Sequence, residues 1–106
     1  MCLVIIFAGV TLGVFTVQAA AAPLACFTNV DVQGIQIIDP AEVSEIAAPG
    51  QGHLHYQVDN GPTISTTAKK LSFHGLTKGS HTIRVVLAGN DHKPLGPHET
   101  LTVDIP

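Results

Sequence analysis

The sequence predicts an all-β protein, a small antiparallel β-sandwich that follows an apolar N-terminal helix. Three observations lead to this class. After residue 27, apolar and polar residues alternate in several short segments, turn-forming Gly, Pro and Asn residues separate these segments, and no segment has a convincing helical period. The chain has 106 residues, so we expect a single sandwich domain over residues 27–106.

The N-terminal segment is apolar and lacks Asp, Glu, Lys and Arg up to residue 30. The run LVIIFAGVTLGVFTV precedes the small residues QAAAAPLA, which predicts a secretory signal over residues 1–22 and a periplasmic or secreted protein. No Lys or Arg precedes the run, which departs from the usual signal. Two alternatives stay open. About 20 apolar residues can anchor a chain in a membrane uncleaved, and residues 23–26 resemble a bacterial lipoprotein box ending at Cys26, with Pro23 where Leu is usual.

The first predicted strand lies in NVDVQGIQIIDP, residues 29–40. Val30 and Val32 point to one side, and the alternation then shifts by one residue at Gly34, which indicates a bulge. Asp39 and Pro40 end the strand. Residues 41–50 are predicted to be a loop with at most one short helix, because ten residues with a Pro-Gly exit make a marginal helix.

The clearest strand is GHLHYQVD, residues 52–59, in which Leu54, Tyr56 and Val58 share one face. The sequence DNGP then predicts a reversal of the chain. The following elements are a short Thr-rich strand, a strand with Leu71 and Phe73 inward, a strand over HTIRVVLAG, a long polar loop over residues 90–99, and a last strand over TLTVDIP. With few aromatic residues, the core must be mainly aliphatic.

Composition argues against several functions. The net charge is −3 and the five cationic residues form no basic stripe, so nucleic acid is not an expected partner. The serines have no nucleophile-elbow context, Glu42 and Glu45 have no predicted cleft, and no phosphate-binding glycine loop occurs. The absence of Trp disfavours carbohydrate stacking. Removal of Cys2 with the signal would leave Cys26 without a disulfide partner. We therefore expect a binding module, not an enzyme.

Six histidines lie between residues 53 and 98, and imidazole is a common ligand of zinc and copper. His53 and His55 share the outer face of one strand, about 6.6 Å apart along it, so their rings can converge on one ion. A third ligand must come from elsewhere in the fold. We predict His92, in GNDHKP, with Asp91, Asp59 and His98 as further candidates.

The alternative is that His53 and His55 belong to a solvated or hydrogen-bonded face with no metal. For the other histidines we expect structural roles. His74 should cap a turn or be exposed, His81 should be partly buried and bonded to a backbone carbonyl, and His98 should be exposed.

The stretch LSFHGLTKGSHTIRVVLAGNDHKP with TLTVDIP resembles the end of immunoglobulin-like domains, which implies an immunoglobulin-like sandwich. GHLHYQVD and GSHTIRVVLAGNDHKPL also resemble uncharacterised bacterial exported domains with a Gly-His-x-His strand and a later Gly-x-His…Asp-His stretch. The His-x-His strand is similar to the copper-binding strand of copper–zinc superoxide dismutases, but that family's zinc loop and disulfide have no match here.

These observations predict an exported binding module that holds copper or zinc through His53, His55 and His92. The alternative is a structural or protein-interaction domain of the cell envelope, with an envelope protein as partner and no metal site. Membrane association is expected only through the N-terminal segment.

Overall fold

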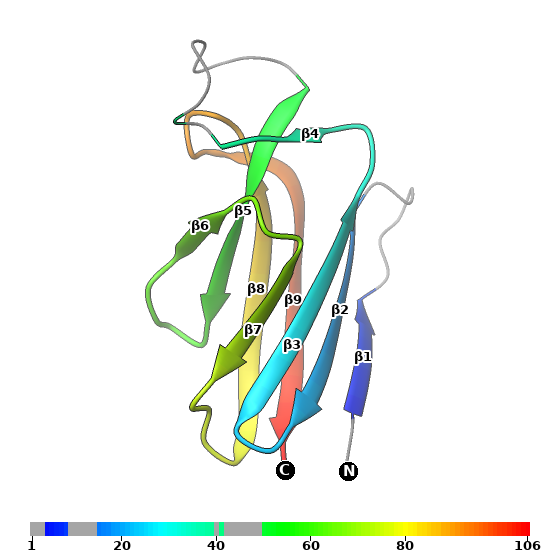
Figure 1. Cartoon of the computed structure of the whole chain (residues 1–106), viewed down its shortest axis with the longest axis vertical. Helices are drawn as coiled ribbons and strands as arrows, with labels where there is room; N and C mark the ends of the chain where they lie inside the picture. Colours follow the sequence, from blue (N-terminus) through cyan, green and yellow to red (C-terminus); the bar gives the residue numbers. More distant parts are fainter. Residues whose placement is uncertain (1–3, 9–14, 40, 42–49) are drawn as a thin grey trace.

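The structure is a computed structural model that describes residues 4–8, 15–39, 41 and 50–106, and the regular elements among them are strands in two sheets (Figure 1). The first sheet is antiparallel, in the order β1-β2-β3-β7. It contains β1 (Val4–Ala8), β2 (Phe15–Ala22), β3 (Ala25–Val32) and β7 (Lys70–His74). The all-β prediction is confirmed.

The second sheet has the order β4-β5-β8-β9, and a short strand, β6, also pairs with β5. Its members are β4 (Gln36–Ile37), β5 (Gln51–Val58), β6 (Ile64–Thr66), β8 (Gly79–Ala88) and β9 (Pro94–Ile105). The pairing of β4 with β5 is parallel, so the prediction of a wholly antiparallel fold is wrong at this edge. A parallel pair needs a crossover in place of a hairpin, and residues 38–50 connect the two strands.

The predicted N-terminal helix is also wrong for the described residues, because residues 4–8 and 15–22 form strands. Every second residue of β2, from Phe15 to Ala21, is buried against the opposite sheet, as expected for a strand with one face in the core. Residues 1–3 and 9–14 of the predicted signal lie outside the described residues, as do residues 42–49 of the predicted loop. No helix in the described residues is long and apolar enough to cross a bilayer. Signal cleavage at residue 22 stays a prediction, and it would remove β1 and β2 from the first sheet, together with the buried β2 residues Phe15, Val17, Ala19 and Ala21.

The core lies between the two sheets and is mainly aliphatic, as predicted. Leu54 and Tyr56 of β5 are fully buried, and the inward residues of β8 and β9 pack with them. The Tyr56 hydroxyl donates a hydrogen bond of 2.7 Å to the Ala68 carbonyl, and burial raises the pKa of Tyr56 to about 12. Cys26 is buried in the same core with its thiol free, and burial raises its pKa. The predicted inward faces of these strands are confirmed.

The last strand is longer than predicted, since β9 begins at Pro94 and the polar loop shrinks to residues 89–93. Prolines are tolerated there because β9 is an edge strand that needs no donor on its open side. A register shift between Val86 and Ala88 fits the strand to β8. This short loop and the start of β5 lie at the end of the sandwich opposite the C-terminus (Figure 1).

Candidate metal centre

β5 supplies two histidines to the outer face of the second sheet. Leu54 and Tyr56 point into the core, so the residues between and before them, His55 and His53, point the other way. The pairing of β5 with β8 fixes this register, with His53 opposite Ala88 and His55 opposite Val86.

The β8–β9 loop supplies the third histidine in a fixed conformation. The backbone N–H of His92 donates to the Gly89 carbonyl at 2.9 Å, and the N–H of Gly89 donates to the Lys93 carbonyl at 2.9 Å. The Lys93 N–H also donates to the Asp91 carboxylate at 3.0 Å. His92 has a φ of 63°, a left-handed conformation that a non-glycine residue adopts infrequently. The tight turn directs the His92 ring back over β5.

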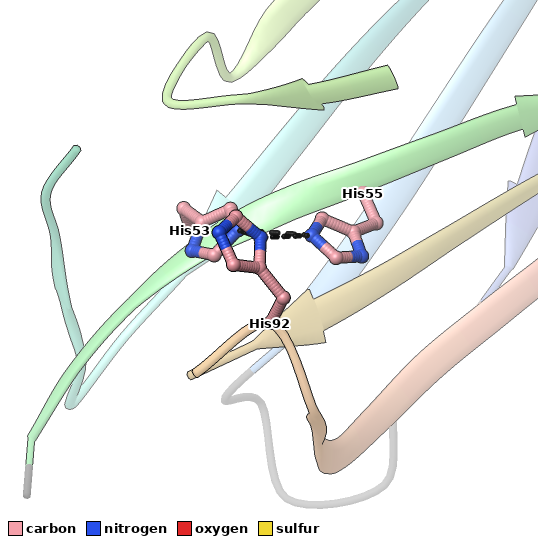
Figure 2. A group of neighbouring side chains, drawn as sticks. All are labelled: His53, His55 and His92. Atoms are coloured by element: carbon pink, nitrogen blue, oxygen red, sulfur yellow. Dashed lines mark hydrogen bonds between the residues drawn. The ribbon is translucent and has the colours of Figure 1, made fainter. Parts of the chain in front are cut away.

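The three rings converge on one point (Figure 2). His53 Nε2 lies 2.9 Å from His55 Nε2 and 3.2 Å from His92 Nδ1, and His92 Nδ1 lies 3.4 Å from His55 Nε2. The predicted meeting of these three side chains is confirmed. Three ring nitrogens at such distances bring lone pairs together unless a proton or a cation lies between them.

The triangle of nitrogens matches a tetrahedral metal. The three separations are short enough for all three nitrogens to reach one ion at about 2.05 Å, the usual zinc–imidazole length. The three separations would then subtend angles of about 90°, 103° and 112° at the ion, so two of them are near the tetrahedral value and the His53–His55 angle is narrower. Three protein ligands in this geometry leave a fourth coordination position open.

The surroundings favour neutral imidazoles. Burial lowers the pKa of His53, and the nearby His55 and His92 lower it further, while Asp39 acts in the opposite direction. Burial also lowers the pKa of His55, with His92 adding to the effect. Neutral imidazole is the form that binds a metal. The environment of His53 and His55 therefore favours the form of these two rings that binds a metal.

The second ring nitrogen of His53, Nδ1, lies outside the triangle and has a different environment. The side chain is fully buried, yet its Nδ1 atom has no hydrogen-bond partner. A polar pocket of about 170 Å³ is lined by Asp39, His53, Ser65, Thr66 and Thr67. Asp39 reaches this pocket because β4 runs parallel to β5, with Ile37 opposite Gly52. A metal-binding histidine ordinarily donates its other N–H to a carboxylate, a carbonyl or water. Here His53 and Asp39 line the same pocket.

The further candidate ligands lie outside the cluster. Asp91 accepts the Lys93 N–H within the loop, and His98 donates to the Gly96 carbonyl at 2.9 Å. Asp59 lies toward the other end of β5 and bonds with His81. These three residues are therefore not placed to complete the histidine triangle.

His81 forms a charged bridge at that other end of the sheet. Its Nδ1 lies 2.8 Å from the Asp59 carboxylate and its Nε2 lies 2.7 Å from the Thr77 carbonyl. Both partners only accept, so this geometry suits the imidazolium form, in which both ring nitrogens donate. The Asp59 hydrogen bond first, and the Thr77 carbonyl next, raise the pKa of His81, and the same contact lowers the pKa of Asp59. The predicted carbonyl bond of His81 is confirmed, as is the exposure of His74 and His98.

Comparisons with protein-family models, curated protein sequences and solved structures find no match. The resemblance to immunoglobulin-like and exported bacterial domains therefore stays a prediction. The structure defines the chain as a two-sheet β-domain with a three-histidine cluster at one end.

Proposed function

We propose that this domain binds a transition-metal ion, zinc or copper, through His53 Nε2, His55 Nε2 and His92 Nδ1. The observation that carries the proposal is the triangle of 2.9, 3.2 and 3.4 Å among these atoms. Two further features support it: the rings come from a paired strand and a hydrogen-bonded loop, and burial favours the neutral form of His53 and His55.

Asp39 is the proposed outer-sphere partner of His53. When Nε2 faces the metal, the ring proton resides on Nδ1, which is the buried atom without a partner. The pocket shared with Asp39 is roomy enough for water to relay this hydrogen bond to the carboxylate. Asp39 already accepts the Ala41 N–H at 2.9 Å through Oδ1, which anchors the carboxylate in place.

The proposal places the domain outside the cytoplasm, in the periplasm or secreted, on the strength of the apolar N-terminal sequence alone. There the domain would hold or pass on metal ions, as a binding module without a reaction of its own. Neither copper nor zinc is preferred by ligand type, because imidazole suits both metals.

Calorimetric titration of the purified protein with Zn²⁺ and Cu²⁺ tests the proposal. The expected result is one ion per chain, with the heat lost when His53 and His55 are both replaced by Gln. The matched control replaces His74 and His98 by Gln, since both are exposed and lie outside the triangle. Absence of binding tighter than about millimolar would reject the metal site and leave the interaction-domain alternative, in which the His53/His55 double variant behaves as the wild type.

A further inference from the structure

A second pocket adjoins the histidine triangle on the same face of the sheet. It has a volume of about 170 Å³, and His55, Gln57, Thr63, Arg84 and Pro94 are among its lining residues. His55, a member of the triangle, therefore lines this pocket. Pro94, two residues after His92, lines it as well. The pocket is a distinct space from the one that contains Asp39.

Strand register places Arg84 beside the triangle. On β5, His55 and Gln57 are outward neighbours, and on β8 their partners are Val86 and Arg84. Arg84 is thus diagonal to His55, a position about 7–8 Å away across a strand pair. Within the described residues, Arg84 takes part in no salt bridge, and no carboxylate lines the pocket.

The electrostatics of this face favour an anion. Three neutral imidazoles would leave the full charge on a divalent ion, and a fourth coordination position would stay open on the side of the ion away from the three rings. Arg84 adds a guanidinium, whose planar fork binds carboxylates and other oxyanions through two parallel hydrogen bonds. Gln57 and Thr63 add polar groups to the wall, although the Gln57 amide already donates to the Gly61 carbonyl at 2.9 Å.

We propose that the metal-loaded domain binds a small anionic ligand of the dicarboxylate type, with one carboxylate on the open metal position and the other on Arg84. This inference rests on the proposed metal site and assigns that site a ligand class. The pocket volume admits only a small molecule, which excludes a folded macromolecule as the group that enters it.

Cobalt substitution gives a test with two separate readouts. Co²⁺ is added to the full chain, and its visible spectrum reports first that the metal is bound and then that an added anion has entered the coordination sphere. Malonate is the two-carboxylate probe, and azide is the probe that contacts the metal alone. We expect both anions to change the spectrum, with malonate binding more tightly.

Variants separate the two ends of the ligand. Arg84→Gln should weaken malonate about tenfold or more, the scale of a lost charge-assisted bidentate contact, and should change azide affinity by less than about threefold. Arg84→Lys keeps the positive charge but lacks the planar guanidinium that makes two parallel hydrogen bonds. Its malonate affinity should therefore fall between those of the wild type and the Arg84→Gln variant. Lys70→Gln removes an exposed cation from the other sheet and is the matched control.

Each outcome bears on one proposal. A protein that takes up neither Co²⁺ nor, in the calorimetric titration, Zn²⁺ or Cu²⁺ rejects the metal site and, with it, the anion site. A protein that takes up Co²⁺ but shows no spectral response to malonate keeps the metal site and loses the anion site. Equal weakening of malonate and azide by Arg84→Gln, or no weakening, also overturns the assignment of Arg84.

Discussion

If zinc binds as proposed, replacement of His92 by Asn should remove most of the stabilisation that the bound zinc would give to the fold. His92 is the best ligand to change because its side chain is exposed and its backbone φ is 63°, a conformation that Asn tolerates well. The two remaining nitrogens, on His53 and His55, stay 2.9 Å apart and can offer only a two-point contact. The apo-protein should therefore fold as before while its metal site is incomplete.

The size of the effect follows from binding linkage. Free zinc at a hundred times its dissociation constant stabilises the folded state by about 2.7 kcal/mol, which raises the Tm of a domain of this size by about 10–20 °C. Changes to outer-sphere partners already weaken metal sites about 10–100-fold. A hundredfold weaker site at the same zinc concentration gives only about 0.4 kcal/mol, or about 2–3 °C.

Thermal unfolding with and without zinc measures this difference. His98→Asn is the control, because His98 is exposed and bonds only within its own strand. The control should keep the full zinc-dependent shift. A full shift in the His92 variant, with the apo Tm unchanged, would show that any zinc bound to the protein does not use this loop and would refute the three-histidine geometry.

Three further predictions concern the frame around the site. Val17→Ala should lower the free energy of unfolding in urea by about 2 kcal/mol, because it removes two fully buried methyl groups from β2. An unchanged free energy would mean that β2 is not part of the folded core. The control is Gln18→Ala, which should change the free energy little because the Gln18 side chain is only half-buried. Gly52→Ala should destabilise the fold by about 1–3 kcal/mol, since the added Cβ would lie 2.7 Å from a β8 carbonyl oxygen; wild-type stability would show that the strands separate easily there. Asp59→Asn should cost about 0.2–1 kcal/mol at pH 5.5 and less at pH 9. Because the pKa of His81 is raised in the folded state, the stability that its charged form contributes is complete below pH 6.5 and is lost as pH rises through the folded pKa. Because the pKa of Asp59 is lowered, the stability that its carboxylate contributes is complete above pH 3.8 and is lost as pH falls through the folded pKa. Equal losses at both pH values would contradict the charged bridge.

The sequence predicts the parts of the fold that depend on local alternation. The period-two pattern of GHLHYQVD places Leu54 and Tyr56 in the core and both histidines on one outer face, and the structure agrees. The same reasoning holds for β8 and for the inward residues of β9. His92 could be anticipated because a loop that follows a neighbouring strand of the sheet can return over that face.

Long-range pairing could not be predicted in the same way. Nothing local to Gln36 and Ile37 indicates a parallel partner, yet that pairing brings Asp39 to the His53 pocket. The diagonal placement of Arg84 likewise depends on a register that only the β5–β8 pairing defines. β2 was misassigned because a continuous apolar run suits a membrane-entering helix as well as a buried strand.

The register of β5 against β8 has a consequence for folding errors. A slip of one residue would turn His53 and His55 into the core and expose Leu54 and Tyr56 to water, and a slip of two would move each histidine one place along the sheet, away from the His92 loop. An ion held by all three rings would therefore be bound only by chains whose strands are aligned as in the structure. Metal binding by the histidine triangle would therefore stabilise this register of β5 against β8 relative to the other registers that hydrogen bonding alone would allow.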